Sequence, residues 1–290
     1  MRFEKWQALG NDYLIVEYDE LPFALTPARV RRLCEGHLGV FADGVLELSR
    51  PADPEHVADL RIFNPDGSEA ELSGNGAREA ILYLRRHWTD RDEFTIHTVA
   101  GEIRPTITGP DTCRVDMGAA RLQSADFPGG PENGRGTVVS AGRTWDFQHV
   151  SIGNPQCAIR IDSAAELAEL ELSAIGPGIE GDAQFPKRTN VSWYTELDSG
   201  PPARVRARIF ERGVGETLSS GTGATGAAIA YALSQGRAGE DATHITVVLD
   251  GGELEVEVGE DLRVNLTGWA VPVFEGRLSD NFVKELNETE

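Results

Sequence analysis

Apolar and polar residues alternate along much of the chain, and this two-residue period is typical of half-buried β-strands. The alternating segments are rich in Val, Ile, Thr and Phe, and tight-turn sequences such as NPDGSE and LDGGEL lie between some of them. The segments are LIVEY, VLELS, DLRIF, FTIHTV, CRVDM, VRARIF, HITVVL, ELEVEV and LRVNL. The pattern therefore predicts a protein that consists mainly of antiparallel sheet.

Helical patterns are fewer. Thr26 and Pro27 open one helix as an N-cap and a proline at the first helical position, and Gly36 ends it. The two other clear helices, in NGAREAILYLRRHW and TGATGAAIAYALSQG, each begin at a Ser-Gly-x-Gly-Ala turn, one at Ser73 and one at Ser220. Because these turns lie about half the chain apart and each precedes an apolar helix, we predict an internal duplication.

The predicted fold is α+β, with two similar pseudo-symmetric domains. Each is expected to be a curved, mostly antiparallel sheet around a central helix, with the active site in the cleft between the domains. Residues 118–136 are rich in Gly, Pro and Asn and have little periodicity, so they are the best candidate for a linker or a long loop. We place one domain at residues 1–118 plus 272–290 and the other at 119–271. A chance similarity of two Gly-rich turns is the alternative to duplication.

The repeated turns predict two anion sites. The first turn of a helix leaves backbone N–H groups unpaired at its positive end, and glycines let a carboxylate approach them. Two such sites on one molecule would place Ser73 and Ser220 on opposite faces of it, which suits removal of a proton from one face and its return on the other. For each serine alone, an N-cap is the simpler interpretation. The matched pair favours a racemase-type site.

Other polar residues near the turns belong to the candidate site. Glu211 and Arg212 follow the strand VRARIF, and neighbours in a strand point to opposite sides, so one could contact an ammonium and the other a carboxylate. A surface ion pair is the alternative. Amide side chains could bind both groups, although turn chemistry also accounts for asparagines at turns. The asparagines concerned are Asn11, Asn64, Asn75, Asn154 and Asn190.

Composition narrows the classes of function. The chain has 290 residues, of which 40% are hydrophobic, and no run approaches the roughly 18 apolar residues of a membrane span. Since the first residues also lack a signal-peptide pattern, we expect a cytoplasmic protein. Cys34, Cys113 and Cys157 have no metal-type spacing and are expected to be reduced thiols. The net charge of −20 argues against nucleic acid and membrane as partners, and we favour solubility over salt adaptation as its cause.

Six motifs, in order along nearly the whole chain, resemble those of diaminopimelate epimerases: LGND, NPDGSEAELSGNGAR, TVAGEI, SIGNP, FPKRTNV and ERGVGETLSSGTGA. The resemblance implies a homodimer without pyridoxal phosphate or metal. It also implies conversion of LL- to meso-diaminopimelate, a small zwitterionic amino acid of lysine and peptidoglycan biosynthesis. Carried over by position, it implies that the substrate site consists of Asn11, Asn64, Asn154, Asn190, Glu211 and Arg212, with the backbone amides of Gly74, Asn75, Gly221 and Thr222 on the reacting carboxylate.

The chain departs from the family at the two bases, because the family has cysteines where Ser73 and Ser220 stand. A thiol has a pKa of roughly 8.5, which a helix N-terminus lowers. A serine hydroxyl needs a partner before it can act as a base, and neither motif contains His or Lys. Gln156 replaces the family's histidine, and Glu79 and Thr225 also depart from common usage. This scatter favours natural divergence over an engineered pair of exchanges.

Three functions stay open at this point. The first is an epimerase whose activity is weak or altered by the serines. The second is a one-base isomerisation or dehydration, for which Glu71, Glu79 or Glu216 could supply the base. The third is a protein that binds a zwitterionic amino acid without turnover. The histidines nearest the motifs, His97 and His149, could assist a serine only if folding places them beside it.

Overall fold

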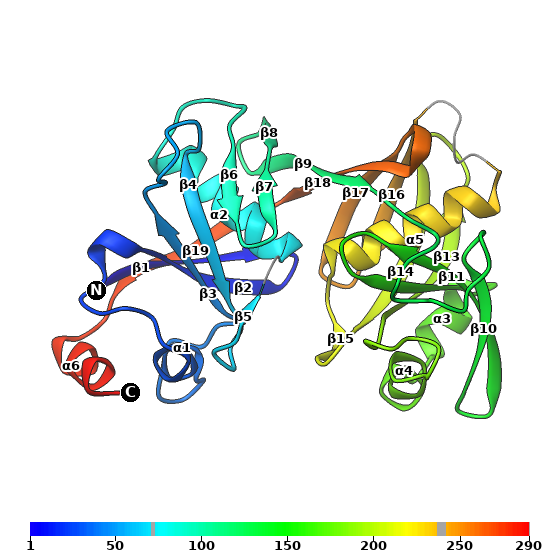
Figure 1. Cartoon of the computed structure of the whole chain (residues 1–290), viewed down its shortest axis with the longest axis horizontal. Helices are drawn as coiled ribbons and strands as arrows, with labels where there is room; N and C mark the ends of the chain where they lie inside the picture. The colour runs from blue at the N-terminus through cyan, green and yellow to red at the C-terminus, as the bar shows by residue number, and fades with distance from the viewer. Residues whose placement is uncertain (71–72, 237–241, 290) are drawn as a thin grey trace. The chain divides into compact units, whose positions relative to one another are not determined.

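The computed structural model describes residues 1–70, 73–236 and 242–289. By its internal contacts the chain divides into two compact units, Met1–Val115 with Gly268–Glu290, and Asp116–Thr267. Each unit contains a large, mostly antiparallel sheet and one long helix packed against it (Figure 1). The predicted α+β class with two similar halves is therefore confirmed.

The sheet of the first unit has the strand order β19-β1-β2-β3-β4-β6-β7, with β5 paired to β4. The pairs β2–β3 and β4–β6 are parallel and the others antiparallel. Its strands are β1 (Arg2–Ala8), β2 (Asn11–Glu17), β3 (Val45–Ser49), β4 (Ala58–Phe63), β5 (Glu69–Ala70), β6 (Ile96–Thr98), β7 (Gly101–Ile103) and β19 (Val271–Arg277). Its helices are η1 (Tyr18–Glu20), α1 (Pro27–Cys34), α2 (Gly74–His87) and α6 (Asp280–Glu288).

Helix α2 packs against β1, β2, β3 and β4. Its residues from Asn75 to Leu84 are buried, while the basic residues Arg85, Arg86 and His87 occupy its last turn. Positive side chains at this end complement the negative pole of the helix dipole. The N-terminal end of α2, at the Ser73 cap, is the positive pole of the same dipole.

The second sheet has the order β10-β11-β12-β13-β14-β16-β17-β18-β9-β8, with β15 paired to β14. Among its pairs, β12–β13 and β14–β16 are parallel. Its strands are β8 (Pro105–Gly109), β9 (Thr112–Ala119), β10 (Arg135–Ser140), β11 (Arg143–Ser151), β12 (Pro155–Arg160), β13 (Asn190–Asp198), β14 (Ala203–Glu211), β15 (Gly215–Thr217), β16 (Thr243–Leu249), β17 (Gly252–Val258) and β18 (Arg263–Trp269). The helices that accompany it are α3 (Ala164–Glu169), α4 (Leu172–Glu180), α5 (Gly221–Ser234) and η2 (Glu260–Leu262).

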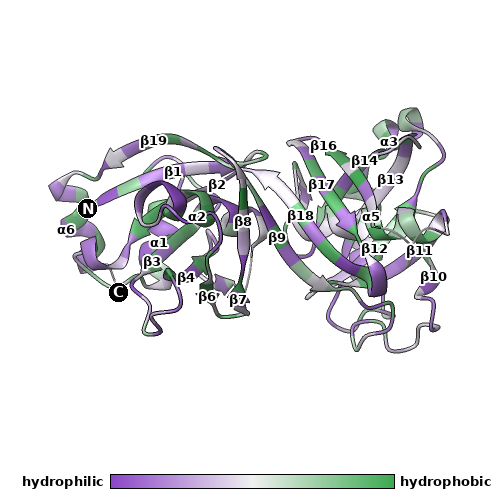
Figure 2. Ribbon diagram, turned by 90° about the horizontal axis from the view of Figure 1, so that it is seen from above, coloured by the Kyte–Doolittle hydropathy of each residue, from purple (hydrophilic) through white to green (hydrophobic). Residues whose placement is uncertain are grey.

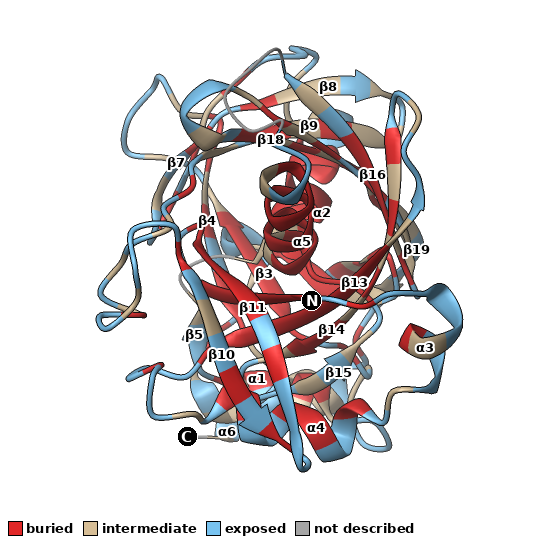
Figure 3. Cartoon of the chain, turned by 90° about the vertical axis from the view of Figure 1, so that its right-hand side faces the viewer, coloured by how far each residue is buried: buried red, intermediate tan, exposed pale blue. Residues whose placement is uncertain are grey.

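Helix α5 is buried along most of its length, as Figure 3 shows in red. It contains mainly Gly, Ala and other small residues, so it is apolar on all sides, which is typical of a helix enclosed by other elements. The surrounding strands β16 and β17 alternate between hydrophobic and hydrophilic residues (Figure 2). Their apolar faces and α5 together form the centre of this unit.

The stretch near residues 118–136, predicted as a linker or a long loop, contains the end of β9, a loop and the start of β10. This loop is tied to β11, because Arg121 and Ser151 exchange backbone hydrogen bonds and His149 N–H donates to the Gly134 carbonyl. It is therefore a covering loop of the second sheet. Within the described part of the chain, no helix is long and apolar enough to cross a membrane.

Candidate active site

Ser73 is the N-cap of α2. Its backbone is extended, with φ −127° and ψ 123°, and its Oγ accepts the Gly76 N–H at 3.1 Å. Its carbonyl accepts the Ala77 N–H at 2.8 Å. The capping interpretation of this serine is therefore correct in the structure, and the cap does not use the amides of Gly74 and Asn75.

The hydroxyl of Tyr13, on β2, donates to Ser73 Oγ at 3.2 Å. Tyr13 is only 5% exposed, and its ring lies beside two glycines. A Cβ at Gly44 would lie 2.5 Å from Tyr13 Cε1, and one at Gly76 would lie 3.3 Å from Cε2. Tyr13 was not among the predicted site residues. The sequence pattern that points to it is its position two residues after Asn11, which places both side chains on the same face of the strand.

The predicted asparagines of the first unit have local partners. Asn11 Nδ2 donates to Asp43 Oδ2 at 2.7 Å, and Asn64 Nδ2 donates to Ser68 Oγ at 2.9 Å within the turn between β4 and β5. The side-chain oxygen of Asn75 is buried and accepts from Arg78. Turn chemistry therefore accounts for Asn64, and an interior contact for Asn75, in this structure.

Ser220 caps α5 in the same way that Ser73 caps α2. Its φ and ψ are −149° and 124°, its Oγ accepts the Gly223 N–H at 3.3 Å, and its carbonyl accepts the Ala224 N–H at 2.9 Å. The side chain is buried, with 4% exposed. The cap leaves the amides of Gly221 and Thr222 for another acceptor.

Glu211, at the end of β14, is the carboxyl group on which Ser220 acts electrostatically. Burial raises the pKa of Glu211, while hydrogen bonds from Thr217 and Ser220 lower it to a smaller extent. The Thr217 bond to Glu211 Oε1 is 2.8 Å long. The Ser220 hydroxyl thus faces a carboxyl group that holds a proton more readily than an exposed glutamate does.

Three polar side chains surround the first turn of α5. Gln156 Nε2 donates to Asn154 Oδ1 at 2.7 Å and to Thr222 Oγ1 at 3.1 Å, and Asn154 Nδ2 reaches Thr222 Oγ1 at 3.2 Å. Gln156 is fully buried, and its Oε1 has no hydrogen-bond partner. Gln156 therefore orients two residues of the predicted substrate site.

The turn that carries Glu211 and Arg212 is held from β13 and α4. Asn190 Oδ1 accepts the Arg212 N–H at 2.9 Å while its Nδ2 donates to the Pro155 carbonyl at 3.1 Å. Glu180 accepts the Gly213 N–H at 2.6 Å. The exposed Arg212 guanidinium donates to the Lys187 carbonyl at 3.0 Å, whereas Glu211 points to hydroxyls. These contacts place the two charged side chains apart, as the strand alternation predicts.

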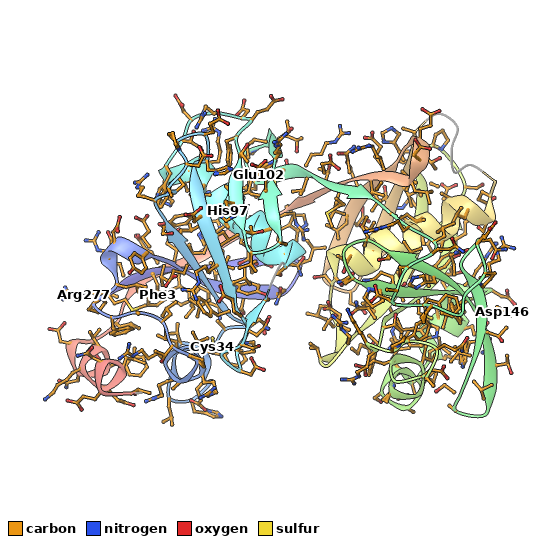
Figure 4. All side chains as sticks on the ribbon, in the orientation of Figure 1. Phe3, Cys34, His97, Glu102, Asp146 and Arg277 are labelled. Carbon is orange, nitrogen blue, oxygen red and sulfur yellow. The ribbon has the colours of Figure 1, made fainter. Side chains whose placement is uncertain are left out.

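The other candidate bases make contacts elsewhere. His97, beside Glu102 in the β6–β7 pair (Figure 4), has its Nδ1 3.3 Å from Asp59 Oδ1. His149 is buried, and its Nε2 lies 3.0 Å from Ser124 Oγ; burial lowers its pKa. Glu216 pairs with Arg208 at 2.6 Å. These contacts give the histidines and Glu216 no role beside either serine.

Glu79 and Arg78 are both fully buried in α2. Burial raises the pKa of Glu79 well above its usual value, and both of its carboxyl oxygens lack a hydrogen-bond partner. Glu79 is therefore an interior group and not a solvated one. Glu71 lies outside the described residues.

The three cysteines are free and buried in α1, β9 and β12. Burial raises the pKa of Cys34 and of Cys113 to about 12, and it raises the pKa of Cys157 well above the ordinary value. These thiols stay protonated at neutral pH, and a protonated thiol is a poor nucleophile and a poor base. They therefore offer no thiolate that could act in place of Ser73 or Ser220.

Two similar units, each with a large sheet and one long helix that begins at a capping serine, form a fold that solved structures of other proteins share. The same fold occurs in a phenazine biosynthesis protein of the PhzF family from Bacillus anthracis, with a TM-score of 0.72, 18% identity and coverage of 96% of this chain and 99% of that one. It also occurs in a hydroxyproline epimerase from Agrobacterium vitis, with a TM-score of 0.62, 15% identity and coverage of 95% and 91%.

The sequence comparisons are more specific. The diaminopimelate epimerase family profile matches residues 3–123 and 148–272. A diaminopimelate epimerase from Synechococcus sp. (strain JA-3-3Ab) is 38% identical over 289 residues, covering 97% of this chain and 99% of the relative. One from Thioalkalivibrio sulfidiphilus is 35% identical over 285 residues, covering 96% and 99%. The chain therefore belongs to the diaminopimelate epimerase family.

Proposed function

We propose that this protein interconverts LL- and meso-diaminopimelate without pyridoxal phosphate or metal, with Ser73 and Ser220 as the proton-transfer groups. In this proposal it is a cytoplasmic homodimer that serves lysine and peptidoglycan biosynthesis. The observation that carries the proposal is the Glu211 carboxyl group at the end of β14, whose pKa the hydroxyl of the α5 cap, Ser220, lowers. It supplies the partner that a serine needs in order to act as a base.

The substrate carboxylate is held by amides at the starts of α2 and α5. These are the amides of Gly74, Asn75, Gly221 and Thr222, which the serine caps do not use. Donors at a positive helix end stabilise the negative charge that develops on the carboxylate when the α-proton leaves. Because the protein carries a net charge of −20, such local donors must overcome an unfavourable overall field.

Ser220 removes the α-proton in one direction of the reaction. Its Oγ accepts the Gly223 N–H, and once the reaction directs its proton to Glu211, one lone pair is left for the substrate. As the α-proton reaches Ser220, the serine's own proton passes to Glu211. A positioned general base typically contributes about 10²- to 10⁴-fold to the rate. Ser73 then returns a proton to the opposite face of the α-carbon.

The test is exchange of the α-hydrogen of diaminopimelate in deuterated water, followed by mass spectrometry and chiral chromatography. The wild-type protein is expected to exchange and epimerise, and Ser220→Ala to lower both rates at least 10²-fold. Ser163→Ala is the matched control, because Ser163 caps α3 through the same bond to the third helical amide. Loss of a cap costs about 1 kcal/mol in either variant.

Two results would contradict the proposal. Binding of diaminopimelate by calorimetry without exchange at any pH would identify a binding protein. Exchange without inversion would identify a one-base isomerisation on the same scaffold.

A further inference from the structure

Ser73 and Ser220 differ in how their hydroxyl groups are used. A hydroxyl has one proton to donate and two lone pairs to accept with. Ser73 Oγ accepts both the Gly76 N–H at 3.1 Å and the Tyr13 O–H at 3.2 Å, so both of its lone pairs are occupied and its proton remains. Ser73 is therefore arranged to give a proton, whereas Ser220 is arranged to take one.

We infer that Tyr13 is the proton partner of Ser73 and that the ionisation of its phenol decides whether Ser73 acts as an acid or as a base. The inference rests on the proposed function. As a phenol, Tyr13 donates to Ser73, and Ser73 donates toward the substrate. As a phenolate, Tyr13 accepts the Ser73 proton and frees a lone pair of Oγ for the α-hydrogen.

The proton transfers balance in both directions. When Ser73 protonates the carbanion, the Ser73 O–H bond breaks, the C–H bond forms, and the Tyr13 proton moves to Ser73 Oγ. In reverse, the C–H bond breaks, its proton joins Ser73 Oγ, and the former Ser73 proton joins the phenolate. Because phenols have an ordinary pKa of about 10 and are much stronger acids than aliphatic alcohols, the charge rests on Tyr13 and not on a serine alkoxide.

The position of the phenol is built into the first unit. Its ring is confined by Gly44 and Gly76, where an added Cβ would approach ring atoms to 2.5 and 3.3 Å. An added Cβ at Gly76 would also approach Leu46 Cδ2 to 3.1 Å, and one at the corresponding glycine of α5, Gly223, would approach Ile209 Cδ1 to 3.0 Å. Both helix starts thus pack against an aliphatic side chain, and the first has the phenol of Tyr13 beside it as well.

The experiment is a double-mutant cycle of Tyr13→Phe with Ser73→Cys. In the serine protein, Tyr13→Phe is expected to lower kcat about 10²-fold or more, as loss of acid–base assistance does. In the Ser73→Cys background the same change is expected to alter kcat less than about threefold, because a thiol with a pKa of roughly 8.5 needs no phenol to ionise. Tyr83→Phe is the control, since Tyr83 donates to Glu17 at 2.7 Å on the same central helix.

Isotope effects provide a second readout within the serine protein. If Tyr13→Phe slows only the proton transfers of Ser73, the kinetic isotope effect of α-deuterated substrate rises in the direction in which Ser73 removes the α-proton. The solvent deuterium isotope effect rises in the opposite direction, in which Ser73 returns a proton. An equal loss of kcat in both backgrounds with unchanged isotope effects would show that Tyr13 is only structural. No loss in the serine protein would also overturn the inference. Failure of the wild-type protein to exchange would instead contradict the proposed function.

Discussion

At the scale of single residues, Glu211 combines a stability penalty with a chemical role. Burial raises its pKa above the ordinary value of 4.5, so the folded protein binds this proton more tightly than the unfolded chain. Its protonated form therefore stabilises the fold at low pH, and that stability is lost as the pH rises through the raised pKa. Ionisation of Glu211 thus lowers the free energy of unfolding, and the proposed reaction requires this ionised form.

We predict that Glu211→Gln raises Tm at pH 7 while it lowers the epimerisation rate about 10²- to 10⁴-fold. The gain in Tm is expected to disappear below about pH 4, where the unfolded carboxyl is also protonated. Calorimetric unfolding from pH 3 to pH 8, together with the exchange assay, measures both effects. Glu216→Gln is the control, because Glu216 pairs with Arg208 and its loss brings no gain. A lower Tm of Glu211→Gln at pH 7 would contradict the prediction.

At the scale of elements, the small residues of α5 set how closely the neighbouring strands approach. A Cβ added at Gly226 would lie 2.9 Å from Gln156 Cβ, which belongs to β12. Gln156 in turn orients Asn154 and Thr222 at the start of the helix. The packing of the helix and the polar network at its end are therefore coupled.

Gly226→Ala is predicted to lower the free energy of unfolding by about 1–3 kcal/mol, as overpacking of an interior does. It should also raise KM for diaminopimelate, because Gln156 must move. Denaturant unfolding and steady-state kinetics check the two parts. Gly259→Ala is a matched control, since its Cβ would meet only the Arg263 carbonyl at 3.6 Å. Equal stability of the two variants would refute the packing argument.

Local patterns predicted the elements that depend on local chemistry. Nine strands followed from alternation, and α2 and α5 from a serine followed by glycines, since those signals lie within a few residues. These strands are β2, β3, β4, β6, β9, β14, β16, β17 and β18. Helix α4 was missed because Gly176, Pro177 and Gly178 are poor helix formers, and its tertiary contacts override that preference. The Tyr13–Ser73 contact could not be foreseen, because it joins residues on β2 and at α2 that only the folded sheet brings together.

At the scale of the whole molecule, the two units carry the same turn with different partners. Ser73 accepts a hydrogen bond from the phenol of Tyr13, whereas Ser220 acts on the pKa of the Glu211 carboxyl group. If both serines transfer protons to one substrate, exchange of only one of them by cysteine leaves the other transfer slow. The two positions must therefore be changed together.

The variant Ser73→Cys, Ser220→Cys is predicted to epimerise diaminopimelate at least tenfold faster than the protein with both serines. Thiols ionise more readily than serine hydroxyls, and a helix N-terminus favours the thiolate. Chiral chromatography of the product measures the rate, and the two single variants are the comparison. Should the double variant bind the substrate and still be no faster, the serines would not be the proton-transfer groups.

The burial of all three thiols has a consequence for the environments in which this protein can work. Peroxide attacks accessible thiolates and converts them through sulfenic to sulfinic acid, which ends their use as bases. In the proposed reaction the proton-transfer groups are hydroxyls, and the three sulfhydryls are protonated inside the fold. If Ser73 and Ser220 are these groups, the reaction is resistant to oxidative damage and alkylation at the positions where the protons are transferred.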